Sequence, residues 1–391
     1  MYFEFLSNVR VNIGDGSAEK IGEYFNSIGA NHPLLIAGPI INKVGLVDML
    51  REDVRRGGVT VRSVFIDVPK DSSSDVVREL VDIYDNNGCD SIIACGGGSV
   101  IDTAKGLRLL LAIEKESLVS AQGIDNAKVS RAVPFAVVPT TSGTGSEVTK
   151  VAVISDAESH VKQEFITEYT LPDITAIDAK FTKSLPLRAT ISTAFDMLTH
   201  AIEAYTGTQK NPVSDAFAMK AIDLFRSSFF AVVADTNDSK AREDMAVASL
   251  LAGISFSNSM VGLAHAIGHA LGGVVGVAHD VAMMMLLPHV MRFNLDECDM
   301  EYAKLLYHLA GSDLYMETKS EERAMQSIKF IENIIDKYAT MYDIKVHLSD
   351  YGVDEETLER VADTAMRDGA IIANRKYASR ADVLEILRSV M

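Results

Sequence analysis

Apolar and polar positions alternate in two different ways along the chain. In the first half, short apolar runs alternate with segments that have helical spacing. The apolar runs predict four β-strands, at residues 33–37, 59–65, 91–95 and 134–138. Helical patterns follow two of them, one through Leu46 and Leu50 and one from Val76 to Tyr84. This alternation predicts βαβ units and a parallel sheet.

The pattern changes near Pro186, after which Ala, Leu, Met and Ile recur at helical spacing and β-like runs disappear. This half predicts a series of helices, at residues 190–206, 212–233, 240–257, 260–271, 280–294, 298–310, 320–341 and 355–367, with another near the C-terminus. We therefore expect two domains, an α/β domain over residues 1–185 and a helical domain over residues 186–391.

Charge narrows the range of partners. The 391 residues include 37 Lys and Arg against 54 Asp and Glu, which gives a net charge of −17. Nucleic acid and anionic membrane both require a basic face, so neither is expected as a main partner. The stretch 245–279 lacks charged side chains, but its three histidines, Asn258 and six glycines argue against a membrane span and for buried helices that carry polar groups.

The compartment follows from cysteine usage and from the start of the chain. Three cysteines cannot form a disulfide framework, and no CxxC pair indicates a structural zinc site. The first residues, MYFEFLSNVR, lack the basic segment and apolar core of a signal peptide. We expect a cytoplasmic protein.

Two polar loops follow predicted strands. Gly96–Ser99 lies between a strand and a helix, where glycines allow backbone N–H groups to approach a phosphate at the helix N-terminus. The alternative is a tight turn without a ligand. Pro139–Thr149 mixes Ser, Thr and Gly and could form a polar wall that a ligand approaches closely, or only a loop that caps a helix.

A group of histidines suggests a metal site. Asp196 and His200 are four residues apart, which places them on one helix face. His265, His269 and His279 lie in or beside the uncharged stretch. Asp with three His is a mixed ligand set suited to Fe(II), Zn(II) or a similar divalent ion. The alternatives are an i,i+4 pair on a solvated face and buried imidazoles that bond to backbone carbonyls.

Together these motifs resemble the iron-containing (group III) alcohol dehydrogenase family. The resemblance extends over nearly the whole chain and weakens after about residue 300. It rests on five segments: Gly96–Ser99 with Asp102 and Lys105, Pro139–Thr149, Asp196–Tyr205, Gly262–Gly273 with His279, and Leu286–Asn294.

The resemblance implies roles for particular residues. It places the metal ligands on Asp196, His200, His265 and His279, and a proton-relay histidine near the substrate on His269. It places the cofactor phosphates on Gly97, Gly98 and Ser99 and the nicotinamide side on Thr140 and Thr141. It also places cofactor contacts on Gly38, Asp102, Thr144 and Lys162.

The resemblance also implies a fold and an activity. The fold is a Rossmann-like α/β nucleotide-binding domain followed by an all-α domain, the architecture of dehydroquinate synthase. The activity is reversible hydride transfer between NADP(H) or NAD(H) and a small primary alcohol or aldehyde. The metal is Fe²⁺, with Zn²⁺ or another divalent ion as alternatives, in a homodimer or larger homo-oligomer. The alternative activities are a glycerol dehydrogenase-like polyol oxidoreductase and a dehydroquinate synthase-like lyase.

The sequence departs from the family pattern at two positions. The family often has Asp at the end of the second strand, where it binds the adenine ribose, whereas this chain has Gly38. Without that carboxylate the site lacks a group that repels a 2′-phosphate, so we expect NADP(H) to be accepted. Many members have Gly after the last metal histidine, and here the residue is Asp280.

Overall fold

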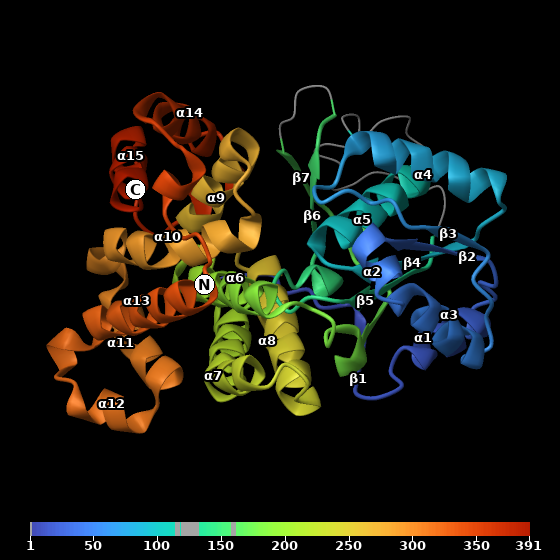
Figure 1. Ribbon diagram of the computed structural model, residues 1–391, viewed down its shortest axis with the longest axis horizontal. Helices are drawn as coiled ribbons and strands as arrows, with labels where there is room; N and C mark the ends of the chain where they lie inside the picture. The colour runs from blue at the N-terminus through green and yellow to red at the C-terminus, as the bar shows by residue number, and fades with distance from the viewer. Residues whose placement is uncertain (1, 114–117, 119–132, 158–161) are drawn as a thin grey trace. The chain divides into compact units, whose positions relative to one another are not determined.

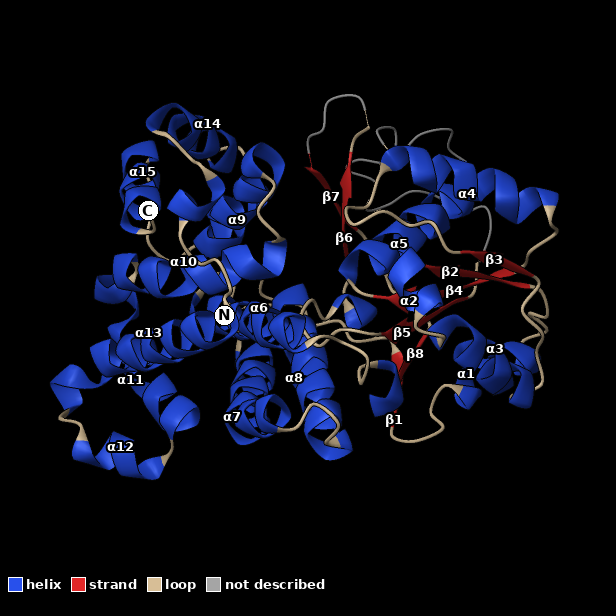
Figure 2. Cartoon of the chain, in the orientation of Figure 1, coloured by secondary structure: helices blue, strands red, loops and turns tan. Residues whose placement is uncertain are grey.

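The computed structural model of the chain describes residues 2–113, 118, 133–157 and 162–391. These residues form two compact units, one of helices and strands and one of helices, which Figures 1 and 2 show. One unit comprises Ser7–Leu185, and the other comprises Pro186–Met391 together with the chain start through Leu6. The predicted order, an α/β part followed by a helical part, is confirmed.

The first six residues group with the helical unit, whereas the expected α/β domain began at residue 1. The Leu6 N–H donates to Asn258 Oδ1 at 2.7 Å, and Asn258 Nδ2 donates to the Leu6 carbonyl at 3.0 Å. The Phe5 ring stacks on Phe217 with centroids 5.8 Å apart. These contacts hold the chain start on the helices.

The α/β unit is built on a six-stranded sheet in the order β1-β8-β5-β4-β2-β3, in which every pairing is parallel. The strands are β1 Arg10–Ile13, β2 Pro33–Ala37, β3 Ser63–Phe65, β4 Ser91–Gly96, β5 Phe135–Pro139 and β8 Ile174–Ile177. The strand predicted over 59–65 is shorter because only Ser63–Phe65 meets partners on β2. The sequence did not indicate β1 or β8, which are four residues each.

Alternate residues of the strands face two different cores. Leu35, Ile93 and Val138 pack with residues of helices α1 and α3. Leu34 and Ile92 point the other way and pack with residues of α4 and α5. The central strands are buried on both faces, as expected of a parallel sheet covered by helices. The helices of this unit are α1 Glu19–Ser27, α2 Pro39–Lys43, α3 Leu46–Arg56, α4 Ser74–Asn86 and α5 Gly98–Ile113, with 3₁₀ turns η2 Ser146–Val148, η3 Glu168–Thr170 and η4 Ala179–Phe181.

A two-stranded antiparallel ribbon, β6 Val151–Ser155 with β7 Lys162–Ile166, completes this unit. It was not predicted. Ala152, Ile154 and Phe165 pack against Leu109 and Leu110 of α5, so one face of the ribbon is buried. All three cysteines are buried and unpaired, Cys89 and Cys95 in this unit and Cys298 in the helical unit.

The helical unit has two apolar cores. Its helices are α6 Leu187–Thr206, α7 Pro212–Ala234, α8 Ser239–Ser257, α9 Leu263–Val275, α10 His279–Phe293, α11 Leu295–Ala310, α12 Ser312–Glu317, α13 Arg323–Tyr342, α14 Glu355–Ala365 and α15 Arg380–Ser389, with 3₁₀ turns η5 Ser320–Glu322, η6 Leu348–Tyr351 and η7 Gly369–Ala373. No helix among the described residues is long and apolar enough to cross a membrane.

The predicted helices of this unit are present, with shifted ends. The helix expected at 260–271 begins at Leu263, because Met260 has a φ of 65° in the left-handed region and Gly262 is the N-cap residue. The short helix α12 was not predicted. Helix α6 is buried along almost its whole length, which places any polar side chain on it inside the unit.

Candidate metal centre

Helix α6 contributes the first two polar groups of the centre. Asp196 and His200 are one turn apart on α6, and His200 Nδ1 lies 3.5 Å from Asp196 Oδ1. Asp196 is 1% exposed and His200 is 5% exposed. The His200 ring stacks on Phe256 of α8 with centroids 4.4 Å apart, which fixes its plane.

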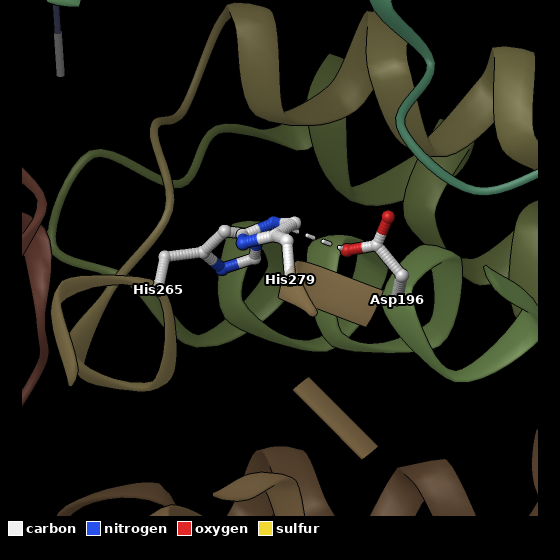
Figure 3. A group of neighbouring side chains, drawn as sticks. All are labelled: Asp196, His265 and His279. Carbon is white, nitrogen blue, oxygen red and sulfur yellow. Dashed lines mark ion pairs between the residues drawn. The ribbon is translucent and has the colours of Figure 1, made fainter. Parts of the chain in front are cut away.

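Helices α9 and α10 bring two further histidines to Asp196. His265 lies in the first turn of α9, and His279 is the first residue of α10. His279 Nε2 is 3.5 Å from Asp196 Oδ1, the contact drawn in Figure 3. One potential ligand atom from each of Asp196, His265 and His279 lies within 4.8 Å of the other two. His200 is not part of this group of three, although its ring centroid is 4.4 Å from that of His265.

Burial determines the protonation of these groups. Burial, followed by the negative charge of Asp280, raises the pKa of Asp196 well above its usual range. Burial, followed by the neighbouring imidazole of His265, lowers the pKa of His200 well below its usual range. Burial also lowers the pKa of His265, with His269 as the next contribution. His200 and His265 are therefore neutral, the form of histidine that binds metals.

The buried atoms of the centre fit a divalent cation. Among the described residues, Asp196 Oδ1, His200 Nδ1 and His265 Nε2 are buried and form no hydrogen bond. Buried polar atoms without partners are costly and call for an explanation. A carboxylate oxygen and imidazole nitrogens are oxygen and nitrogen donors of the kind that Fe²⁺ and Zn²⁺ bind. A cation bound there would also offset the cost of a buried carboxylate.

Two carboxylates outside the predicted ligand set hold two of the histidines. Glu203 Oε2 lies 2.6 Å from His265 Nδ1, and Asp368 Oδ2 lies 2.9 Å from His269 Nδ1. Burial raises the pKa of Glu203 to about 7. The sequence places Glu203 on the helix face of Asp196 and His200, which left capping, a surface position, support of the metal site and ligation all open. Asp368 had no signal, because it is 99 residues from His269 along the chain.

Asp280, the departure from the family pattern, contacts α6. It accepts a hydrogen bond from Ser192 Oγ, and Ser192 lies one turn before Asp196. Asp280 thus ties the start of α10 to α6 and adds a negative charge close to Asp196. Both effects act on the position and charge of the metal centre.

In the α/β unit, the glycine-rich turn joins β4 to α5 as predicted. A Cβ on Gly98 would lie 2.9 Å from Thr144 Cγ2, and one on Gly97 would lie 3.2 Å from Thr141 Cγ2. The turn therefore packs closely on the Ser/Thr loop that follows β5, and side chains would separate them. Gly98 and Ser99 begin the sixteen-residue helix α5, so backbone N–H groups of a helix N-terminus lie at this turn.

A buried polar layer supports these loops. Asp102 accepts hydrogen bonds from Ser146 Oγ at 2.7 Å and from the Val153 N–H at 2.9 Å. Lys105 Nζ donates to the carbonyl of Thr149 at 2.9 Å and to that of Val151 at 2.6 Å. The Asp102 carboxylate thus organises the chain around the loop, and a direct contact with the cofactor stays a prediction.

The remaining predicted cofactor residues lie in the same unit. Thr140 is buried, and its N–H donates to the Gly96 carbonyl at 3.0 Å. Lys162 is the first residue of β7, and its Nζ lies 3.5 Å from Asp71 Oδ1. Gly38 directly follows β2 and is the N-cap residue of α2. Their contacts with a cofactor stay predictions.

Comparison with known families matches almost the whole chain. Residues 8–179 match the family described as iron-containing alcohol dehydrogenase. Residues 190–391 match the C-terminal part of the Fe-containing alcohol dehydrogenase family. The two segments correspond to the α/β unit and the helical unit.

Individual proteins show the same relationship. The chain is 32% identical to NAD-dependent methanol dehydrogenase of Bacillus methanolicus over 380 residues, 97% of each chain. It is 32% identical to 1,3-propanediol dehydrogenase of Citrobacter freundii over 390 residues, 99% of this chain and 98% of the other. A solved structure of 1,3-propanediol oxidoreductase is similar at a TM-score of 0.93 and 31% identity, with both chains fully covered.

Proposed function

Because the chain belongs to the iron-containing alcohol dehydrogenase family and is an oxidoreductase that acts on alcohols, we propose the following reaction. A small primary alcohol and NAD(P)⁺ give the aldehyde and NAD(P)H, reversibly. The observation that carries this proposal is the convergence of the buried, unbonded atoms of Asp196, His200 and His265 beside His279. Relatives named methanol dehydrogenase and 1,3-propanediol dehydrogenase support short alcohols as substrates.

The metal in this proposal is Fe²⁺, and Zn²⁺ or another divalent ion fits the same oxygen and nitrogen donors. Asp196, His200, His265 and His279 would hold it. A divalent cation there supplies Lewis-acid chemistry, which lowers the pKa of an alcohol hydroxyl and polarises an aldehyde carbonyl. Because His200 and His265 are held neutral, their imidazoles would offer nitrogen lone pairs to the cation, and Asp196 would offer a carboxylate oxygen.

His269 is the proton-transfer residue in this proposal. Its Nδ1 lies 2.9 Å from Asp368 Oδ2, and a carboxylate can only accept, so the ring holds its proton on Nδ1. Nε2 of that tautomer can then take up a proton released by the alcohol and return it to an aldehyde. Asp368 fixes the ring orientation and stabilises the charged form.

The cofactor would bind through the α/β unit. Gly97, Gly98 and Ser99 offer backbone N–H groups to its phosphates, and Thr140, Thr141, Thr144 and Lys162 would contact its nicotinamide half. Gly38 leaves the second strand without a carboxylate, which supports acceptance of NADP(H) beside NAD(H). We further propose a cytoplasmic homodimer or larger homo-oligomer, and the three buried, unpaired cysteines agree with a reducing compartment.

The test combines metal analysis with a panel of alcohols and aldehydes and both cofactors. His265→Ala removes one imidazole, so we expect lost metal occupancy and activity at least ~100-fold lower, a barrier about 2.7 kcal/mol higher. Circular dichroism should show an intact fold. A variant that is fully active without metal would contradict the proposed centre.

A further inference from the structure

Glu203 makes three hydrogen bonds inside the helical unit. It lies on α6 and is 6% exposed. Its Oε2 accepts from the Gly262 N–H at 2.7 Å, and its Oε1 accepts from the Ala264 N–H at 2.6 Å. Oε2 also lies 2.6 Å from Nδ1 of His265. We propose that Glu203 is a positioning residue that fixes the tautomer and orientation of His265 for metal binding, an inference that rests on the proposed metal centre.

The direction of the third bond follows from its chemistry. Each oxygen of Glu203 accepts a backbone N–H, which favours the ionised carboxylate. An ionised carboxylate only accepts hydrogen bonds, so His265 carries its ring proton on Nδ1. The lone pair of the neutral ring then lies on Nε2. That nitrogen is the buried His265 atom that forms no hydrogen bond among the described residues. Glu203 thus keeps the nitrogen in the group with Asp196 and His279 free of a proton.

The same carboxylate fixes the main chain that carries His265. Gly262 is the N-cap residue of α9, and Ala264 lies in its first turn. Their N–H groups are among those that a helix N-terminus leaves without intrahelical partners. A Cβ on Gly262 would lie 3.1 Å from Glu203 Oε1, so glycine permits this close approach. The Glu203 side chain therefore holds both the backbone of the first turn of α9 and the imidazole ring of His265.

An alternative is that Glu203 only caps α9 and stabilises the fold. Asn374 provides a control for this, because its Oδ1 accepts from the Leu263 N–H at 3.4 Å at the same helix end. Asn374 also exchanges hydrogen bonds with Asn294, and no hydrogen bond joins it to His265 among the described residues. Loss of Asn374 removes a cap without touching the imidazole.

The experiment measures Zn²⁺ affinity of the metal-stripped full-length protein by competition with a chromophoric chelator. Glu203→Gln keeps the shape, but its amide nitrogen cannot accept, so at least one of the three donors loses its acceptor. The negative charge beside His265 Nδ1–H is lost as well. We expect Zn²⁺ affinity to fall ~10- to 100-fold. Asn374→Ala should lower the melting temperature and keep the affinity within ~3-fold. His265→Ala gives the loss expected when the ligand itself is absent.

Co²⁺ absorption gives a second readout that helix capping alone would not move. In Glu203→Gln, the visible bands of bound Co²⁺ should shift from those of the wild type, whereas Asn374→Ala should leave them unchanged. Unchanged Zn²⁺ affinity in Glu203→Gln, with loss in His265→Ala, would overturn the inference and leave the metal centre intact. Equal losses in Glu203→Gln and Asn374→Ala would also overturn it. A wild type that binds neither ion would overturn the proposed centre itself.

Discussion

Each histidine in the second metal segment has its own carboxylate. His265 contacts Glu203, His269 contacts Asp368, and His279 contacts Asp196. Sequence reasoning found the histidines because three of them in or beside an uncharged stretch are unusual. It could not find the partner Asp368, because a contact across 99 residues depends on the fold.

His265 and His279 are proposed metal ligands, whereas His269 is the proposed proton carrier, and this difference can be tested. His269→Ala removes the proposed proton carrier and none of the proposed ligands, so metal content should stay near that of the wild type while turnover falls ~10²-fold or more. The pH dependence of kcat should change as well. Asp368→Asn, which keeps the imidazole, should show a smaller fall. Metal analysis beside steady-state kinetics checks this, and a metal-free His269→Ala would show that His269 is a ligand.

Gly38 carries the prediction on cofactor choice. A Cβ at Gly38 would lie 3.6 Å from the Val68 carbonyl and 3.8 Å from Val100 Cγ2, which are ordinary contacts, so Gly38→Asp should fold. Its carboxylate would repel the 2′-phosphate of NADP(H) and could bond to a ribose hydroxyl. We expect the ratio of kcat/KM for NADPH over NADH to fall at least ~10-fold.

Gly38→Ala is the matched control, because it adds the Cβ without the charge and should leave the ratio near that of the wild type. If the wild type uses only NAD(H), or if Gly38→Asp has an unchanged ratio, Gly38 does not read the 2′ position. The exposed side chains of Asn42 and Lys43, on the short helix that Gly38 begins, would then need the same test.

Among the elements, α5 carries polar groups in its buried surface. Asp102 and Lys105 bond to the segment that contains Glu147, and the side chains of Lys105 and Glu147 are buried. Burial lowers the pKa of Lys105 to about 8 and raises the pKa of Glu147 to about 7. The layer joins the helix that follows the glycine-rich turn to the Ser/Thr loop at the cost of buried charge.

That cost predicts a pH-dependent effect of Glu147→Gln. The pKa of Glu147 is higher in the folded protein, so the folded state binds more protons than the unfolded state between pH 4.5 and about 7. The Glu147 contribution to stability therefore falls as pH rises through this window. The variant should be more stable than the wild type at pH 8, by up to about 3 kcal/mol, and the difference should fall below about 1 kcal/mol at pH 5.

Thermal unfolding at pH 5 and pH 8 measures this effect. Glu79→Gln is the control, because Glu79 is exposed on α4 of the same unit and should shift the melting temperature equally at both values. A variant that is less stable than the wild type at pH 8 would show that the attraction between Glu147 and Lys105 outweighs the burial of the carboxylate.

The prediction of elements from the sequence succeeded where their patterns were long. The buried strands β2, β4 and β5 and the long helices of the second half were found, because their apolar periodicity persists over several turns or a whole strand. The four-residue strands β1 and β8 were missed, because their identity comes from pairing with each other and with β5. The ribbon of β6 and β7 was missed for the same reason.

For the whole molecule, the residues proposed to bind the metal and those proposed to bind the cofactor belong to different units. Every proposed metal ligand lies in the helical unit, and every proposed cofactor residue lies in the α/β unit. The sequence could predict this division because each motif lies within one half of the chain. It could not predict the placement of the first six residues, which depends on their contacts with Asn258 and Phe217.

This division predicts two separate footprints in hydrogen exchange. A ligand that binds only the folded state suppresses opening of the elements that hold it. Adding Zn²⁺ to the metal-stripped protein should slow exchange in α6, in α9 and at the start of α10. Adding NADPH should slow exchange at the turn before α5 and in the loop after β5. Protection by Zn²⁺ confined to the α/β unit would contradict the assignment of the ligands.

Each unit contains a buried cysteine whose rate of alkylation reports how often that unit opens. Cys95 lies in a sheet core and Cys298 in a helical core, with exposures of 0% and 1%. Burial raises the pKa of Cys95 to about 12 and that of Cys298 to about 11, so almost no reactive thiolate exists while the chain is folded. Alkylation at either sulfur thus requires local or global opening. Peptide mass spectrometry of samples taken during alkylation would give the rates at Cys95 and Cys298 together. These rates report the opening of the two units without an engineered label.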